Sequence, residues 1–501
     1  MKRTRQVLFL IVLAVTFSIA TFTELPISVK AVSIIIYGLI ILSIIYVLIL
    51  ENRSPYRTLL WVYALMFLPV IGYMFFLYSG QLEVRGHLYR QKREQARELL
   101  NTSLSFRSSS YWDQLDEREQ CLSQLIKTFG DNPISFHSTT DVLKNGEETF
   151  SAIKEAIQKA ESYIHLEYFT FESDEIGQEM IDLLCEKAGH SVEVRLIYDS
   201  FGSSSLSKKA IKQMKDAGIA VASFEPVQAG FLTQKLNFRN HRKIIVVDGD
   251  VGFVGGLNIG DEYLGRDPNI GFWRDTHLVL KGEVVKTLQK TFLLDWSYTA
   301  DEKLVDSRYF ESKKLEDSPG GVQILASGPD SPVEGIMGDL YYELIASAKK
   351  SVFIATPYFI PNKALRTALS MAGKKGIDVK IITPEINDSF LTKHATRSYF
   401  TEMLDYDIEI YLYQKGFLHE KMIMIDEEYG SIGTANFDLR SLHLNFEINA
   451  FLFETESVKD LVKHYREDLL DSQKVERETY EQRGILARTK ESFARLFSPI
   501  L

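Results

Sequence analysis

The stretch NHRKIIVVD, residues 240–248, sets a histidine and a lysine just before a run of isoleucine and valine, and an aspartate just after it. A buried strand ordinarily carries no titratable groups, so one such stretch has a plain explanation: a strand whose polar ends include a histidine. However, HEKMIMID, residues 419–426, repeats the H-x-K-x4-D spacing at an offset of 178 residues. The sequence therefore indicates two matched sites.

The repeat extends beyond the motif. A glycine lies seven residues after each aspartate and an asparagine three residues later, and both pairs are again 178 residues apart: Gly255 with Gly433, and Asn258 with Asn436. With lysine and aspartate each at roughly one residue in twenty, a given histidine meets the motif by chance about once in 400 trials. Two matches in register are not accidental. The flanking segments repeat as well: 162–171 with 351–360, 191–200 with 376–385, and 217–224 with 405–413.

Each half of the repeat alternates short β-rich runs with helical stretches. This alternation is typical of an α/β unit, and we expect a mostly parallel or mixed sheet covered by helices. Two tandem units predict a pseudo-two-fold arrangement in which equivalent loops face each other. We place the first domain at residues 131–315 and the second at 316–501.

The N-terminal region reads as a membrane anchor. Three windows without charge are 18, 20 and 25 residues long, and roughly 20 apolar residues cross a bilayer as a helix; they are residues 6–23, 31–50 and 58–82. A cleaved signal peptide is the alternative for the first window, and it is disfavoured because a second apolar span follows within ten residues. The third contains Pro69 and Gly72, so it either crosses with a kink or dips in and returns. We expect two or three apolar helices in residues 1–82.

Basic residues cluster on both sides of this anchor: Lys2, Arg3 and Arg5, then Arg85, Arg90, Lys92, Arg93 and Arg97. Both clusters favour the cytoplasmic side, which implies an even number of crossings and a cytoplasmic catalytic part. Residues 83–130 are predicted to be a polar helical linker.

Charge and cysteine content argue against a nucleic-acid-binding protein and against a disulfide-rich secreted protein. Setting aside the six basic and two acidic residues of 1–82 leaves 51 basic and 65 acidic residues, a net of −14. A nucleic-acid-binding protein usually has the opposite sign, so no nucleic-acid partner is expected. Cys121 and Cys185 form no disulfide framework in so long a chain and suit a reducing compartment.

The repeated residues suit a phosphodiester. Alternate side chains of a strand share a face, so His241 and Lys243 are expected to point one way and Arg242 the other, with the second copy following suit. The non-bridging oxygens gain negative charge in the transition state, and four side chains can receive it: Lys243, Lys421, Asn258 and Asn436. Metal-ligand spacing is absent, and we expect no cofactor and no metal. One histidine attacks phosphorus while the other protonates the leaving alcohol and then deprotonates the acceptor.

Further acids complete the candidate site. Asp275 and Glu447 are the best candidates to hold the second ring nitrogen of each histidine; the alternative for either is a plain strand-edge acid. The predicted catalytic set comprises the six motif residues: His241, Lys243, Asp248, His419, Lys421 and Asp426. Within this set, we interpret Asp248 and Asp426 as structural residues that close the turn after each strand.

These motifs resemble the phospholipase D superfamily, whose signature is the doubled H-x-K-x4-D followed by G-x-x-N. Longer stretches resemble bacterial cardiolipin synthases over nearly the whole chain: NHRKIIVVDGDVGFVGGLNIGDEYLG, FWRDTHL, FLLDW, ATPYFIP, FLHEKMIMID, GTANFDLRSLHLNFEINA and the membrane segment LLWVYALMFLPVIGYMFFLYSG. The resemblance implies a multi-pass protein of the bacterial cell membrane.

By the same resemblance, a phosphatidyl group passes from one phosphatidylglycerol to another, giving cardiolipin and glycerol through a phosphohistidine. It implies that His241 is the nucleophile and His419 the general acid/base, although the repeat itself is symmetric on this point. Glu420 stands where the family has a small residue, and the strand argument turns it away from the site. The apolar span at 6–23 is a further departure and leaves the number of crossings open.

Rival functions remain at this stage. A phospholipase D-type hydrolase or another phosphatidyltransferase carries the same doubled motif, because pocket shape selects the acceptor. A membrane-tethered nuclease or phosphodiesterase is disfavoured by the acidic soluble part, and an inactive interaction protein by the intact motif in both halves. Oligomeric state, acyl-chain preference and regulation are not determined by the sequence.

Overall fold

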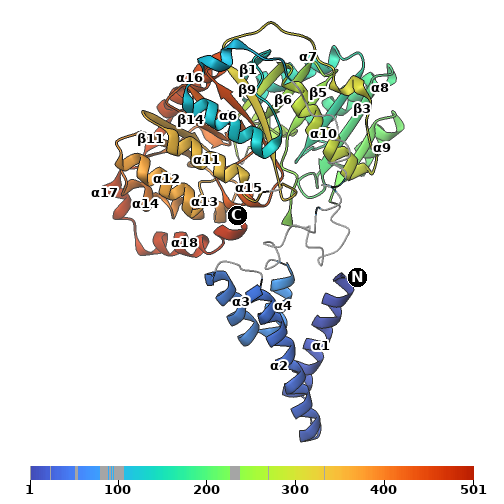
Figure 1. Cartoon of the computed structure of the whole chain (residues 1–501), viewed down its shortest axis with the longest axis vertical. Coiled ribbons are helices and arrows are strands. Elements are labelled where there is room, and N and C mark those ends of the chain that lie inside the picture. Colours follow the sequence, from blue (N-terminus) through green and yellow to red (C-terminus); the bar gives the residue numbers. More distant parts are fainter. Residues whose placement is uncertain are drawn as a thin grey trace. The chain divides into compact units, whose positions relative to one another are not determined.

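The computed structural model describes residues 2–22, 24–50, 55–78, 89, 92, 94, 106–225, 237–268, 270–331 and 333–501 (Figure 1). The chain divides into two compact units. One comprises residues 1–90 with 227–237, and the other comprises residues 91–226 with 238–501.

Four helices are described in the N-terminal unit: α1 (Lys2–Phe22), α2 (Ile27–Leu50), α3 (Pro55–Phe67) and α4 (Pro69–Tyr78). Among the described residues, α2 is the one helix long and apolar enough to cross a membrane by length and composition, and it matches the second predicted window. The other apolar helical stretches, Leu10–Thr21 and Thr58–Phe67, are shorter. The number of crossings therefore stays a prediction.

The third window is broken at the proline that the sequence singles out. Helix α3 ends at Phe67 and α4 begins at Pro69, because proline fits the first turn of a helix but not its interior. A Cβ atom at Gly72 would lie 2.5 Å from the carbonyl oxygen of Ala64, so glycine permits the two helices to approach closely. Residues of all four helices share one apolar cluster: Leu13, Ile41, Ile44, Leu48, Leu65, Tyr73 and Phe76.

The second unit contains two α/β domains, drawn from blue-green to yellow-green and from yellow to red in Figure 1. The first sheet has the order β1-β8-β6-β5-β2-β3-β4. Its strands are β1 (Ser138–Lys144), β2 (Tyr163–Tyr168), β3 (Glu193–Asp199), β4 (Ala220–Phe224), β5 (Ile244–Val247), β6 (Val251–Gly255) and β8 (Thr276–Gly282). Helices flank this sheet: α7 (Asn145–Gln158), α8 (Glu175–Gly189), α9 (Lys208–Asp216) and α10 (Val285–Ala300).

The second sheet has the order β9-β16-β15-β14-β10-β11-β12-β17, which matches the first strand for strand with β17 added at one edge. Its strands are β9 (Gly321–Ser327), β10 (Ser351–Ala355), β11 (Asp378–Pro384), β12 (Glu409–Tyr413), β14 (Met422–Ile425), β15 (Tyr429–Gly433), β16 (Glu447–Phe453) and β17 (Ser472–Lys474). The larger flanking helices are α6 (Glu117–Gly130), α11 (Ile336–Ser347), α12 (Lys363–Lys374) and α16 (Glu456–Leu470), with shorter ones at α13 (Phe390–Arg397), α14 (Phe400–Leu404), α15 (Leu439–His443), α17 (Arg477–Glu481) and α18 (Ile485–Arg495).

Two domains with mixed sheets flanked by helices are therefore confirmed, but the expectation of mostly parallel pairing is wrong. The parallel pairs are β2–β3 and β3–β4 in the first sheet, and β10–β11 and β11–β12 in the second. The other neighbours pair antiparallel, because the motif strands β5 and β14 return through tight hairpins rather than helical crossovers. Asp248 and Gly249 take positive φ values of 53° and 72° in the first hairpin turn, which suits an Asp-Gly pair. The predicted domain boundaries stay predictions.

Short backbone pairings join the two domains. Strand β7 (Phe272–Arg274) of the first domain pairs in parallel with β13 (Gly416–Leu418) of the second. An isolated bridge likewise joins Asn240 to Phe446. Each pairing lies just before a motif histidine of one domain and just before an acid of the other. The pairing therefore holds that histidine next to that acid.

The predicted linker 83–130 is described only in part, since 83–88, 90, 91, 93 and 95–105 lie outside the described residues, and with them Arg85, Arg90, Arg93 and Arg97. Helix α6 begins at a capping box formed by Asp116 and Glu119 and packs on the second domain. There Arg118 pairs with the motif residue Asp426 at 2.5 Å. Lys92 is buried between Asp295 and Asp330, at 2.6 Å from each carboxylate.

Candidate active site

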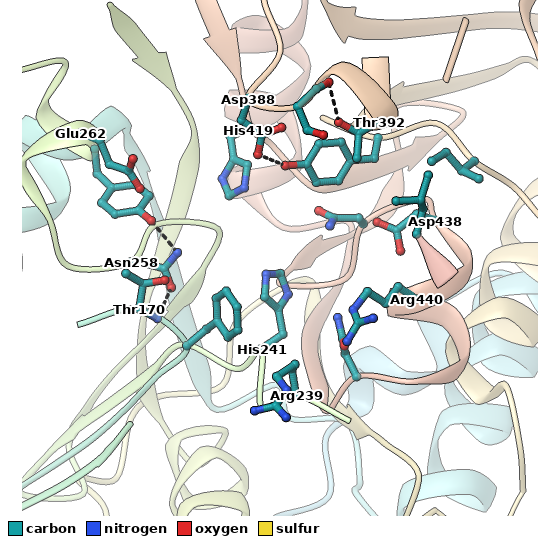
Figure 2. Close-up of a pocket in the computed structure, with 18 of the residues that line it drawn as sticks. Thr170, Arg239, His241, Asn258, Glu262, Asp388, Thr392, His419, Asp438 and Arg440 are labelled. Carbon is teal, nitrogen blue, oxygen red and sulfur yellow. Dashed lines mark hydrogen bonds between the residues drawn. The ribbon is translucent and has the colours of Figure 1, made fainter. Parts of the chain in front are cut away.

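Both copies of the motif meet at one pocket of about 380 Å³ between the two domains. His241 lines it from the first domain and His419 from the second, and their rings lie across the pocket from each other in Figure 2. The pocket also receives both repeated asparagines, Asn258 and Asn436. The structure thus brings together residues that are 178 positions apart in the sequence.

The backbone holds each histidine against the other domain. The N–H of His241 donates to the carbonyl of Phe446 at 2.9 Å, and that of His419 donates to the carbonyl of Arg274 at 2.7 Å. The sequence had suggested that each histidine and lysine lies within a strand. In the structure they directly precede the strands β5 and β14, and their backbone bonds instead to the other domain. The apolar strands anchor the segments without containing them.

Each imidazole is held by an acid of the opposite domain. His241 Nδ1 lies 2.9 Å from Glu447 Oε2, and His419 Nδ1 lies 2.7 Å from Asp275 Oδ2. Both carboxylates are fully buried. A carboxylate at Nδ1 accepts its proton and leaves Nε2 as the reactive atom toward the pocket. The sequence named both acids, but only the structure shows that the pairing crosses between domains.

Burial is the largest influence on the pKa values of these four side chains. It lowers the pKa of His241, although Glu447 acts in the opposite direction, and it lowers the pKa of His419 well below the ordinary value. Burial also raises the pKa of Asp275. For Glu447, burial acts to raise the pKa but the charge and hydrogen bond of His241 outweigh it, so the pKa falls below its usual range. Neutral imidazoles therefore prevail at neutral pH, and a bound anion would favour their protonation.

The two motif lysines lie behind the histidines and are not among the residues that line the pocket. Lys243 Nζ donates to the carbonyl of His241 at 2.8 Å, and Lys421 Nζ lies 2.7 Å from His419 Nδ1. Burial lowers the pKa of Lys243 to about 7 and that of Lys421 to about 8. The negative charge of a bound phosphate would raise the pKa of both lysines and so favour their positively charged ammonium form.

The side chains between the lysines and histidines point elsewhere. Arg242 donates to the carbonyl of Ser327 at 3.0 Å and pairs with Asp295. Glu420 is fully buried and lies 2.7 Å from Arg274. Neither lines the pocket, so the expectation that Glu420 faces away from it is confirmed. Both side chains instead form ion pairs or hydrogen bonds that cross the domain boundary.

The repeated asparagines differ in their surroundings. Asn258 donates to the hydroxyl of Tyr263 at 2.9 Å and accepts the N–H of Thr170 at 3.1 Å. Asn436 Oδ1 is buried and has no hydrogen-bond partner among the described residues. An unsatisfied buried amide oxygen in a pocket is suited to a ligand group that donates a hydrogen bond, such as a hydroxyl.

The motif aspartates lie outside the pocket and organise backbone. Asp248 accepts the N–H groups of residues 161, 162 and 163 at 2.8 Å each, ahead of and into β2. Asp426 accepts the N–H groups of residues 349–351 in the same manner. This geometry supports the structural interpretation, and a direct part in catalysis for either stays a prediction.

Several charged and aromatic residues of the pocket were not predicted from the sequence: Phe169, Arg239, Glu262, Tyr358, Asp388, Asp438 and Arg440. The repeat itself carried a signal for some of them. Glu262 and Arg440 are 178 residues apart, and Phe169 and Tyr358 hold the same place in the repeated flanks 162–171 and 351–360. Among the described residues, no group of three or more histidine, cysteine, aspartate or glutamate side chains could hold a metal ion.

Comparison with known proteins fits this geometry. A family model described as "Cardiolipin synthase, PLD-like domain" matches residues 153–296 and 341–469. The chain is 50% identical over 466 residues to the probable cardiolipin synthase YwiE of Bacillus subtilis, covering 93% of each chain. It is 45% identical to the cardiolipin synthase of Geobacillus sp. (strain WCH70), covering 92% of each chain.

A solved structure shares the fold. Phosphatidylserine synthase from Haemophilus influenzae superposes with a TM-score of 0.59 at 15% identity, over 77% of this chain and all of that one. The resemblance seen in the motifs is confirmed at the level of the family and of its two phospholipase D-like domains. The chain is an enzyme and belongs to the cardiolipin synthase family, phosphatidyltransferases of the phospholipase D superfamily.

Proposed function

We propose that this enzyme transfers a phosphatidyl group from one phosphatidylglycerol to a glycerol hydroxyl of a second, producing cardiolipin and free glycerol. One observation carries the proposal: two imidazoles, each anchored at Nδ1 by a buried carboxylate of the opposite domain, line the same pocket. A pair of this kind suits double displacement at phosphorus, since one ring can attack while the other transfers the proton.

In the first step, His241 Nε2 attacks the phosphorus of the donor lipid. The nitrogen–phosphorus bond forms as the bond from phosphorus to the glycerol oxygen breaks, and His419, whose protonation the bound anionic lipid favours, gives its proton to the departing glycerol. In the second step, neutral His419 takes the proton of the acceptor hydroxyl. The new oxygen–phosphorus bond forms, the bond to His241 breaks, and both imidazoles return to their starting states. The choice of His241 as nucleophile follows the family resemblance.

The surrounding residues have supporting parts in this scheme. Asn258 and Asn436 are proposed to donate to the non-bridging phosphate oxygens, with Lys243 and Lys421 providing positive charge from behind the histidines. No metal and no cofactor are needed, because these cations meet the charge that develops on the phosphate. Asp248 and Asp426 position the strands.

The proposed lipid substrates favour a location in the bacterial cell membrane. We propose residues 1–82 as a multi-pass anchor with two or three apolar helices and cytoplasmic catalytic domains. On α2, large apolar side chains face outward, with Ile35 and Leu39 each 62% exposed, as expected for a lipid-facing helix. The matching strand orders of the two sheets support the proposed pseudo-two-fold arrangement.

The nucleophile can be tested with labelled lipid. His241→Ala and His419→Ala variants are incubated with phosphatidylglycerol carrying labelled phosphate, and the protein is examined for an acid-labile adduct. The scheme expects an adduct in His419→Ala and none in His241→Ala. The reverse result would exchange the two roles, and an adduct in both variants would contradict the scheme.

The rival function is a phospholipase D-type hydrolase that uses water as the acceptor. Purified full-length enzyme in phosphatidylglycerol vesicles distinguishes the two by its products. Cardiolipin with an equal amount of free glycerol supports the proposal. Phosphatidic acid as the main product would establish hydrolysis instead. The names of the close relatives favour the first outcome.

A further inference from the structure

The pocket is symmetric in its catalytic residues and asymmetric in its charge. Arg239 and Arg440 lie at the His241 end, with Asp438 next to Arg440, whereas Glu262 and Asp388 lie at the His419 end, as Figure 2 shows. Glu262 and Arg440 occupy equivalent positions of the repeat, four residues after the repeated asparagines. The charge at this position is thus reversed between the two halves.

The proposed reaction needs extra positive charge in only one of its steps. In the first step the pocket holds one phosphate, that of the donor. In the second step it holds the phosphate bound to histidine and also that of the incoming acceptor, which lies one glycerol unit away. Two phosphates in a buried pocket repel each other unless cations are close to both. The proposed function assigns the motif lysines and the repeated asparagines to the reacting phosphate, which leaves the second phosphate to other cations of the pocket.

We propose that Arg239 and Arg440 form a second anion subsite, which binds the non-reacting phosphate of the acceptor phosphatidylglycerol. This inference rests on the proposed function and identifies how that site selects a lipid acceptor over a neutral alcohol.

The surroundings of the two arginines fit this assignment. The side chain of Arg239 is 5% exposed; its Nη1 lies 3.5 Å from Asp199 Oδ1 and its guanidinium 5.4 Å from the ring centre of Phe201, so packing fixes its position. Arginine binds phosphate oxygens through two parallel N–H groups, which gives orientation as well as charge.

The groups beside these arginines are polar or charged. Asn445 lines the same pocket, and its Nδ2 donates to Glu447 Oε1 at 3.2 Å. Asp438 immediately precedes α15, the helix that contains Arg440, and it accepts the N–H of Ser441 at 2.7 Å as the cap of that helix. Burial raises the pKa of Asp438 to about 6, and the charge of Arg440 acts on it in the opposite direction, so a bound phosphate would share the arginine with this carboxylate.

The experiment compares two acceptors on the same covalent intermediate. Full-length enzyme in phosphatidylglycerol vesicles with labelled glycerol forms cardiolipin when a second lipid is the acceptor, and labelled phosphatidylglycerol when glycerol is the acceptor. Glycerol carries no phosphate, so exchange does not use the proposed subsite. Arg440→Gln is expected to lower the ratio of cardiolipin to exchange by about 10- to 100-fold, the effect of losing a hydrogen bond to a charged group.

Two further variants test whether the positive charge of each arginine is sufficient for its effect. Arg440→Lys keeps the charge and should recover part of the ratio, while Arg239→Lys tests the buried partner without removing its charge. Arg466→Gln, whose arginine is 61% exposed and pairs with Glu427, is the matched control and should leave both rates unchanged.

The outcomes separate this inference from the proposed function. If Arg440→Gln lowers both products in the same proportion, or neither, the subsite assignment is wrong. If the unmodified enzyme forms no cardiolipin, the proposed function itself fails. Added inorganic phosphate should not change the ratio; a ratio that falls with phosphate in the unmodified enzyme, but not in Arg440→Gln, would assign the subsite to free phosphate instead of lipid.

Discussion

Replacing Glu447 with glutamine tests whether the acid of one domain serves the histidine of the other. The carboxylate is fully buried, lies 2.9 Å from His241 Nδ1, and accepts the hydroxyl of Thr434 at 2.6 Å. Glutamine preserves the shape and removes the charge. It can also present its amide N–H₂ to the ring, which would force the proton onto Nε2 and block attack on phosphorus.

The size of the effect follows from the charge pair. Two opposite charges about 4 Å apart attract by about 4 kcal/mol at an effective dielectric constant of 20. At about 1.36 kcal/mol per tenfold change in rate, this corresponds to a loss of about 10³ in kcat. A reversed tautomer would add to this loss, since amide substitution at the corresponding acid of a catalytic triad costs about 10⁴.

The assay is the initial rate of cardiolipin formation across pH, with the melting temperature measured alongside. Because Glu447 opposes the effect of burial on the pKa of His241, its removal should lower that pKa further and move the acidic limb of kcat/KM to lower pH. Glu456→Gln, an 84% exposed acid at the start of α16, is the control. A loss below about threefold at an unchanged melting temperature would refute the assignment.

Three further predictions concern stability and metal dependence. Asp248→Ala should lower the melting temperature by about 2–10 °C, because three backbone N–H groups lose their acceptor at about 1–3 kcal/mol in total; calorimetry of the purified variant measures this. Lys92→Met should lower the free energy of unfolding by about 3–5 kcal/mol, because buried Asp295 keeps less compensating charge. Lys92→Arg should recover part of this stability, and thermal melting of both variants measures the difference. Chelator treatment should leave cardiolipin formation unchanged, since lysine side chains are proposed to supply the charge that a metal would otherwise carry.

A last prediction concerns the pH dependence of stability. Burial, assisted by the charge of Glu420, raises the pKa of Asp468 to about 7, so folding favours its protonated form. The stability that this protonation contributes is present at low pH and is lost as pH rises from about 4 through 7. Glu420→Gln should bring the pKa of Asp468 down and reduce the fall in melting temperature between pH 5 and pH 8. An unchanged pH dependence would show that Glu420 does not raise the pKa of Asp468.

The matched controls for these variants are exposed ion pairs, which contribute little to stability. Lys459 is 70% exposed and pairs with Glu456 on the surface of α16, so Lys459→Met should shift the melting temperature far less than Lys92→Met. If the two lysine variants behave alike, the buried position of Lys92 does not contribute as proposed. If Asp248→Ala melts as the unmodified enzyme does, the backbone contacts of that carboxylate are not stabilising.

The sequence was sufficient for features that repeat or recur locally. The doubled motif identified the histidines and lysines, because chemistry of this kind requires those residue types at a fixed spacing. Alternating apolar runs and helical segments predicted two α/β domains, since burial of a strand leaves a local pattern in its residues. The apolar stretch that forms α2 was likewise recognisable from its length and composition alone.

Other features depend on contacts between residues far apart in the chain. Pairing of His241 with Glu447 and of His419 with Asp275 crosses between domains, over separations of 206 and 144 residues. Strand direction in the sheets was misjudged because the apolar pattern of a buried strand is the same for parallel and antiparallel neighbours.

The difference has a physical reason. Spacing along the chain determines which side chains a strand or helix can present on one face, and the sequence records this directly. Which acid meets which histidine, and which charges share a pocket, depends on how the domains pack and on backbone bonds such as those of β7 with β13. No local pattern encodes that packing, so the tertiary structure alone decided which acid holds each histidine and that Glu262 and Arg440 line the same pocket.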